Sequence, residues 1–302
     1  MHMAFINKFD EIRKNKIRSV ILVAFFIVLI GILGALFGVY IGNTYTGLIF
    51  AVVLSIIYSL IMYYSGGNLI LNMTGAKPVT KKEHPHLYHT VEGLAIAAGV
   101  PTPKAYVIDD SALNAFATGR DPKNSVVVVT TGLLKKLNRQ ELEGVIAHEM
   151  SHIKNYDIRL MMLTTVLVGI VVLLSDFILR SFLWGAHGRR REAGNATAIL
   201  ILIGLILAIL TPIVAHLIKL AVSRKREFLA DATGALLTRY PEGLASALEK
   251  IKGDPDPLVD RANKATAHLF ISTPFRREKG YVTNLFSTHP PIDERIKRLR
   301  RM

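Results

Sequence analysis

His148-Glu149-Met150-Ser151-His152 has the arrangement H-E-x-x-H, and the residues around it predict a helix. Side chains four residues apart lie on one face of an α-helix, so both imidazoles can reach a single metal ion. The glutamate between them shares that face, where its carboxylate can take a proton from a metal-activated water. The pentapeptide therefore predicts the chemistry of zinc-dependent hydrolysis. The alternative is a surface helix whose histidines and glutamate are solvated.

The helix around this motif has a recognisable start. Asn138 can serve as the N-cap, and Glu141 three residues later completes the pattern of a capping box. Leu142, Val145 and Ile146 then supply an apolar stripe. These residues predict a helix that begins after Asn138 and carries the two histidines.

A catalytic zinc in a tetrahedral site usually has three protein ligands, and the histidine pair supplies two. The sequence contains no Cys, so the third ligand must be an imidazole or a carboxylate. Glu227 and Asp231 lie four residues apart on a predicted helix beyond a later apolar run. If the intervening runs form a hairpin, these acids return to the level of His152. The alternative is an exposed acid paired with Arg224 or Lys225.

The composition indicates a membrane protein with a polar domain attached. Of 302 residues, 51% are hydrophobic, yet 37 are Lys or Arg and the formal net charge is +14. Charged and apolar residues are segregated along the chain, and basic residues gather at the ends of the apolar runs. We therefore expect the partner of the basic residues to be a lipid bilayer with anionic headgroups, and no nucleic acid.

Two apolar runs near the N-terminus, Ser19 to Gly42 and Thr46 to Ser65, are each long enough to cross a bilayer as a helix, and we expect them to form a hairpin. Basic residues precede the first run and follow the second, whereas the connecting loop has no charge, so both flanks are predicted to be cytoplasmic. Small residues recur every four positions and offer stripes for close helix packing: Gly34, Gly38, Gly42, Ala51, Ser55 and Ser59.

A second pair of apolar runs, about Leu160 to Leu179 and Ala196 to Ala221, follows the histidine-containing helix. The loop between these runs is basic, so the second hairpin either crosses the bilayer against the charge rule or leans into the interface without spanning. The sequence thus divides into five parts. They are a cytoplasmic N-terminal segment (1–18), a first hairpin (19–65), the first part of a polar domain (66–159), a second hairpin (160–221) and the rest of the polar domain (222–302).

The polar domain is predicted to be α+β. Pro85 to Ala98 has the apolar spacing of an amphipathic helix. Three short strands are predicted at Ala105 to Ile108, Leu113 to Thr118 and Ser125 to Thr130. The polar, Pro-containing residues after Gly253 predict a loop-rich lid or flank.

Three motifs, in this order around the two predicted hairpins, resemble those of the HtpX membrane metalloproteases, relatives of the CAAX prenyl protease type I enzymes. The resemblance covers nearly the whole chain. It implies a zincin-like α+β protease domain, predominantly α, attached to two transmembrane hairpins with four apolar helices. The motifs are His148-Glu149-Met150-Ser151-His152, Glu227-Phe228-Leu229-Ala230-Asp231, and Thr288-His289-Pro290-Pro291 with Glu294-Arg295.

The resemblance also implies a metal site. In that site one Zn²⁺ per chain is held by His148, His152 and Glu227, and Glu149 is the catalytic base. Asp231 would orient a ligating imidazole through a hydrogen bond.

Two further assignments come from the same resemblance. His289 is the candidate for a second donor to the developing oxyanion, and the alternative is a loop histidine with no catalytic part. Asn114-Ala115-Phe116-Ala117 resembles an edge strand that can bind an extended peptide, and the alternative is a core strand. Arg295 is expected to hold the C-terminal helix in place.

These features together imply a multi-pass zinc endopeptidase of the plasma (inner) membrane, with its N-terminus and protease domain in the cytoplasm. The expected role is protein quality control under stress, by cleavage of misfolded or damaged membrane proteins and unfolded polypeptides. Prenyl-protein processing is less favoured, because that branch of the family has more than four apolar runs. The non-enzymatic alternative is a membrane scaffold or carrier with incidental histidines.

Overall fold

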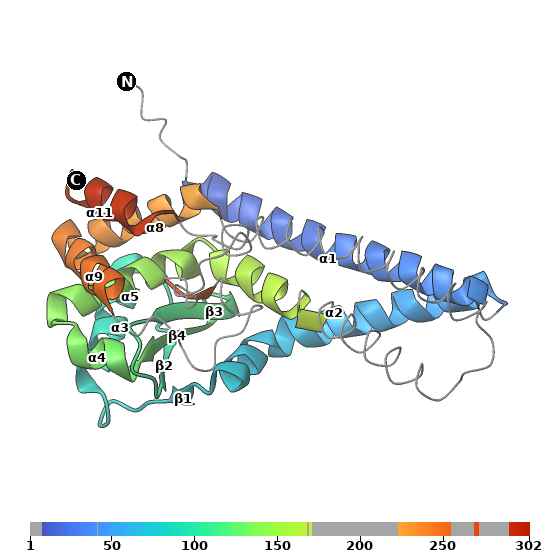
Figure 1. Ribbon diagram of the computed structural model, residues 1–302, viewed down its shortest axis with the longest axis horizontal. Coiled ribbons are helices and arrows are strands. Elements are labelled where there is room, and N and C mark those ends of the chain that lie inside the picture. The colour runs from blue at the N-terminus through green and yellow to red at the C-terminus, as the bar shows by residue number, and fades with distance from the viewer. Residues whose placement is uncertain (1–7, 41, 168, 171–222, 255–268, 272–289) are drawn as a thin grey trace, which may run out of the picture.

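A computed structural model of the chain describes residues 8–40, 42–167, 169–170, 223–254, 269–271 and 290–302 (Figure 1). Two long helices, α1 (Lys8–Tyr40) and α2 (Thr44–Thr74), form a hairpin that projects from a mixed domain of helices and strands. Both are apolar and long enough to cross a membrane, by length and composition. The predicted first hairpin is thus confirmed, and α2 continues beyond Ser65 into the domain.

The hairpin helices approach closely where small residues meet. A Cβ built on Gly34 would lie 2.1 Å from the Cβ of Ala51 and 2.7 Å from the carbonyl oxygen of Gly47. Ser55 and Ser59 are buried one and two turns along α2 from Ala51. Residues with little or no side chain are needed for such an approach, which explains the spacing seen in the sequence.

The mixed domain contains a four-stranded sheet in the order β1-β2-β4-β3. β2 and β4 are parallel, and the outer pairs, β1 with β2 and β3 with β4, are antiparallel. The strands expected at residues 105–108 and 125–130 are confirmed, whereas β1 has no counterpart in the prediction. The strand bounds are β1 (Lys77–Pro78), β2 (Lys104–Ile108), β3 (Ala115–Asp121) and β4 (Asn124–Thr130).

β3 differs from its predicted extent, Leu113 to Thr118. It begins at Ala115 and continues through Gly119 to Asp121, with a shift of register between these last two residues. Gly119 has a φ of +142°, and a Cβ there would lie 2.2 Å from the carbonyl oxygen of Asn124. Glycine therefore permits a bulge within the strand and does not end it.

Helices enclose the core around α5, which contacts α3, α8, α9 and β3. The helix predicted for residues 85–98 is confirmed as α3, whereas α4 and α9 were not predicted. Figure 1 shows α8, α9 and α11 gathered at the end of the domain from which α1 starts. The bounds are α3 (Pro85–Ala98), α4 (Thr131–Lys136), α5 (Arg139–Lys154), α8 (Arg224–Thr238), α9 (Pro241–Gly253) and α11 (Ile292–Leu299).

Most of the predicted second hairpin, residues 171–222, lies outside the described residues. Its first part is helical at residues 157–167 and packs against α2. There the Tyr58 hydroxyl donates to the Val166 carbonyl at 3.2 Å, and a Cβ on Gly66 would lie 3.3 Å from Met162. The predicted loop-rich segment is described only at residues 269–271, which are buried, and from residue 290 onward, where α11 follows.

Gly144 lets α5 approach α9, because a Cβ at this position would lie 2.5 Å from the backbone nitrogen of Leu244. We expect Gly144→Ala to reduce the free energy of unfolding by roughly 1–3 kcal/mol, since one backbone must move away from the other. Thermal unfolding of the purified protein measures the change.

Gly93→Ala, on α3, is the matched control, because a Cβ there meets nothing within 4 Å. It should be neutral or should stabilise the protein by up to about 1 kcal/mol through helix propensity. Equal unfolding temperatures for the two variants would contradict the close contact between α5 and α9.

Candidate metal centre

α5 presents the histidine pair, and its start is the predicted capping box. The Asn138 side chain accepts a hydrogen bond from the Glu141 backbone N–H at 2.9 Å, and the Glu141 carboxylate accepts one from the Asn138 N–H at 2.8 Å. Lys250 of α9 also binds Glu141 at 2.7 Å. His148 and His152 are only 1% and 4% exposed. The alternative of a solvated surface helix is therefore wrong.

α8 brings Glu227 to the same place. Glu227 lies on the buried face of α8 and is only 3% exposed, so the alternative of an exposed acid is also wrong. Gly234 allows this approach, because a Cβ there would lie 3.1 Å from the backbone nitrogen of His148. α5 ends at Lys154 and α8 begins only at Arg224, so two helices distant in sequence share one buried contact.

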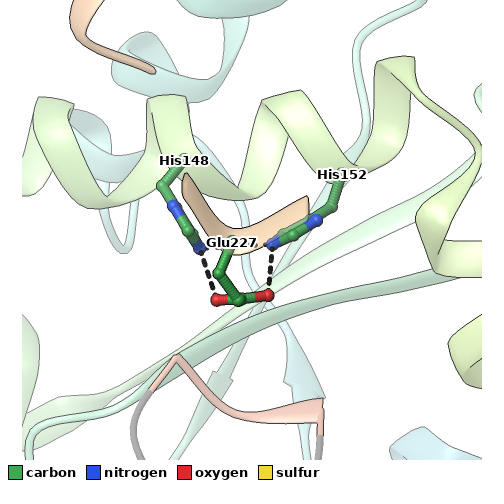
Figure 2. A group of neighbouring side chains, drawn as sticks. All are labelled: His148, His152 and Glu227. Atoms are coloured by element: carbon green, nitrogen blue, oxygen red, sulfur yellow. Dashed lines mark hydrogen bonds and ion pairs between the residues drawn. The ribbon is translucent and has the colours of Figure 1, made fainter. Parts of the chain in front are cut away.

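The three side chains converge on one point, as Figure 2 shows. The Nε2 atoms of His148 and His152 are 3.2 Å apart, and the Glu227 carboxylate oxygens lie 3.7 Å and 3.6 Å from them, respectively. Four ligands at about 2.0–2.1 Å from a tetrahedral zinc are separated from one another by about 3.3 Å. The spacing of these three donors therefore fits a zinc ion between them.

The far side of each imidazole ring is held by a carboxylate. His148 Nδ1 lies 2.9 Å from Asp231, and His152 Nδ1 lies 3.0 Å from Asp157. A ring nitrogen that donates to a carboxylate carries the proton, so the lone pair of each Nε2 is left to face the other two donors. The donor set thus has the tautomers that a metal ion requires.

Asp157 is a site residue that the sequence analysis missed. It follows His152 by five residues, after the turn in which α5 ends, and it is 2% exposed. An acid so close to the motif is the only sequence signal, because burial and orientation are set by the tertiary structure.

Arg295 of α11 is fully buried beside the centre. Its guanidinium makes two hydrogen bonds to Asp231, at 2.9 Å and 2.7 Å, and a third to the Ile271 carbonyl at 3.1 Å. It also lies 3.4 Å from the ring of His148 and 3.9 Å from Glu227. The C-terminal helix is therefore fastened to α8 through a group that orients His148.

Glu149 is buried beside His152 and Glu227 and accepts a hydrogen bond from the backbone of Ala117 on β3, the edge strand of the described sheet. Burial raises the pKa of its carboxyl group to about 7, although the neighbouring His152 and a backbone hydrogen bond from Ala117 act against the shift. A carboxyl group with this pKa can exist in either protonation state near neutrality.

Residues 81–302 match the model of peptidase family M48. The chain belongs to this family. It is 53% identical over 256 residues to the protease HtpX homolog of Dictyoglomus turgidum, which is 85% of this chain and 82% of that protein. It is 47% identical over 294 residues to the protease HtpX homolog of Tropheryma whipplei strain Twist, which is 97% of this chain and 98% of that protein. The resemblance to HtpX proteases is thus confirmed.

Among solved structures, the crystal structure of S. mikatae Ste24p matches with a TM-score of 0.49 and 20% sequence identity. The match covers 92% of this chain and 61% of the length of that chain.

Membership in family M48 makes the chain a metallopeptidase and therefore an enzyme. The scaffold or carrier alternative is wrong.

The segment Asn114–Ala117 of this M48 peptidase lies at the edge of the sheet, although its side chains are buried. The Ala115 carbonyl accepts a hydrogen bond from the Ile271 N–H at 2.9 Å, and Ala117 contacts Glu149. The edge therefore faces the metal centre, and its peptide-binding role remains a prediction. His289 lies outside the described residues, so its role also remains a prediction.

We expect Arg295→Met to reduce the free energy of unfolding by about 3–5 kcal/mol, because it leaves the Asp231 charge buried without its guanidinium partner. Arg298→Met on the same helix is the control. Its ion pair with Glu294 is exposed, and its guanidinium lies 3.7 Å from the centroid of the Phe228 ring, so the loss of both contacts should cost no more than about 2 kcal/mol. Thermal unfolding in detergent compares the two, and an equal shift would contradict the role given to Arg295.

Proposed function

We propose that this chain is an integral-membrane zinc endopeptidase that cleaves misfolded or damaged membrane proteins at the cytoplasmic face. The observation that carries the proposal is the convergence of His148, His152 and Glu227, each buried and with donor atoms within 4.8 Å of one another. Cleavage of peptide bonds is supported by membership in family M48 and by the similarity to proteins named HtpX proteases.

His148, His152 and Glu227 would hold the zinc, in agreement with the spacing of their donor atoms. When bound, zinc lowers the pKa of a water molecule and polarises the peptide carbonyl. The chain supplies the proton transfers. Glu149 accepts a proton from the attacking water and then delivers it to the leaving amine.

The buried acids and arginines keep these groups in position. Asp231 and Asp157 each hold one Nδ1–H, so neither ring can rotate to turn its Nε2 away. Arg295 fixes Asp231 in turn, and its positive charge lies close enough to stabilise negative charge near the centre. We propose His289 as an additional donor, on the ground of its family motif.

We propose that the substrate backbone binds along the outer edge of β3, on the residues Asn114–Ala117 and toward the bulge. The Ala115 carbonyl accepts from Ile271, and the backbone of Ala117 donates to Glu149, so a substrate strand on this segment would replace these contacts. Main-chain pairing is independent of side chains, which suits an enzyme that acts on unfolded polypeptides of many sequences. β3 is an edge strand of the described sheet, as this mode of binding requires.

The plasma (inner) membrane is the proposed location. α1 and α2 leave large apolar side chains uncovered, such as Val20 at 69% and Phe50 at 66% exposed. A bilayer would cover this surface. The basic residues that flank the hairpin favour an orientation with the N-terminus and the protease domain in the cytoplasm.

Glu149→Gln tests the catalytic proposal, because it keeps the shape of the side chain and removes its basicity. We expect the purified variant to keep about one zinc per chain and to lose roughly 10²–10⁴-fold in the rate of casein cleavage. Metal analysis and a peptide-release assay measure the two quantities. Glu143→Gln, a half-buried residue of α5 that pairs with Arg139, should change neither.

A wild-type chain that contains no zinc, or a Glu149→Gln variant with normal turnover, would overturn the proposed function. Removal of the metal by a chelator should abolish cleavage in the wild type, and added zinc should restore it.

The orientation can be tested with single cysteines, because the natural chain has none. In intact cells, a membrane-impermeant thiol reagent should label Tyr45→Cys at the tip of the hairpin and should leave Lys82→Cys unlabelled until the cells are opened. Both positions are exposed. Labelling of Lys82→Cys from outside would place the protease domain on the opposite side of the membrane.

A further inference from the structure

Asn15, at the N-terminal end of α1, is buried beside the metal centre. Its side chain is 0% exposed, although it belongs to the membrane hairpin and lies before the apolar run that begins at Ser19. Its amide Nδ2 donates to Asp157 Oδ1 at 2.6 Å and to the Asn155 carbonyl at 3.0 Å. Both hydrogens of the amide group are therefore used on the segment that follows α5.

The same Asp157 holds the metal ligand. Its other oxygen, Oδ2, lies 3.0 Å from His152 Nδ1. A continuous path of two hydrogen bonds thus runs from α1 to a metal-ligating imidazole, by way of one carboxylate. In Figure 1, α1 starts next to α8. Arg226 of α8 lies 3.4 Å from Asp157 Oδ1.

Asn15 and Arg226 together hold one oxygen of the Asp157 carboxylate. The Asn15 amide lies 2.6 Å from Oδ1 and Arg226 Nε lies 3.4 Å from it, so the amide is the closer contact. With Oδ1 held there, Oδ2 faces the Nδ1–H of His152. Without the amide, only the longer Arg226 contact holds Oδ1, and the carboxylate can turn to present both oxygens to the guanidinium and leave His152.

We propose that Asn15 is a positioning residue of the metal site, through which the membrane helix α1 orients the zinc ligand His152. This inference rests on the proposed zinc site. It makes the first hairpin part of the active-site architecture as well as an anchor. Groups that orient a ligating histidine typically affect metal affinity by about 10–100-fold, so the effect is measurable in zinc binding itself.

The test uses the full-length protein in detergent micelles and measures the zinc dissociation constant by competition with a chelating dye. Asn15→Asp has nearly the same shape, but it loses the donor and places a second negative charge against Asp157. We expect zinc to bind about 10-fold or more weakly. Asn15→Ala, which adds no charge, should weaken binding in the same direction.

Exchange of the amide at position 15 and the carboxylate at position 157 gives the most specific test of their hydrogen bond. In the double variant Asn15→Asp with Asp157→Asn, the new amide at position 157 can donate to the new carboxylate at position 15 and accept from His152 Nδ1. We expect the double variant to recover part of the affinity that Asn15→Asp loses, because the donor to the Asn155 carbonyl is still missing. If the second substitution restores zinc affinity that the first one lowers, the two side chains interact directly.

Ser19→Ala is the matched control for packing of α1. Ser19 is buried one turn further along, and its hydroxyl donates to the backbone carbonyl of Asn15 at 2.8 Å, away from Asp157. We expect its zinc affinity to equal that of the wild type, even if the unfolding temperature falls.

The inference is overturned if both Asn15 variants unfold at lower temperature but bind zinc as tightly as the wild type. It is also overturned if the swapped variant binds zinc no better than Asn15→Asp. If Asn15→Asp does not fold, the zinc affinity of Asn15→Ala alone tests the inference. A wild type without zinc, or His152→Ala with unchanged affinity, would instead overturn the proposed metal site.

Discussion

Buried negative charge is the constraint on which this structure depends. Four carboxylates, those of Glu149, Asp157, Glu227 and Asp231, lie at most 3% exposed around two imidazoles. The guanidiniums of Arg226 and Arg295 supply two positive charges to this group. Buried charges are tolerated only when they are compensated, and a zinc ion would supply further positive charge at the centre of this group.

That concentration of charge is assembled from distant segments by close helix packing. The histidines come from α5, whose start is fixed by its own capping box. Gly144 and Gly234 then allow α9 and α8 to approach α5 at backbone distance, and the second of these contacts carries Glu227 and Asp231 inward. Glycine in a helix is locally unfavourable, so these positions are explained by tertiary contact and not by propensity.

Local chemistry could be predicted from the sequence, whereas tertiary partners could not. The α5 cap, α3 and the first hairpin follow from neighbouring residues, and their predictions are confirmed. The strand predicted at Leu113 to Thr118 stops too early, because β3 continues through a bulge at Gly119 to Asp121 that depends on the pairing with β4. Asp157 and Asn15 were missed because 142 residues separate the members of their hydrogen bond, and no periodicity relates them.

The hairpin contacts the helical residues 157–167, which follow the metal-binding helix α5, near both of their ends. Asn15 of α1 binds Asp157 at the start of helical residues 157–167, and Tyr58 of α2 binds the Val166 carbonyl near their end. A segment held at two points by a rigid hairpin cannot rotate without breaking one contact. The proposed role of Asn15 thus ties the direction of the Asp157 carboxylate, and with it the His152 ring, to the position of α1. Small residues hold α1 against α2, so the helix that carries Asn15 is itself placed by the hairpin contact.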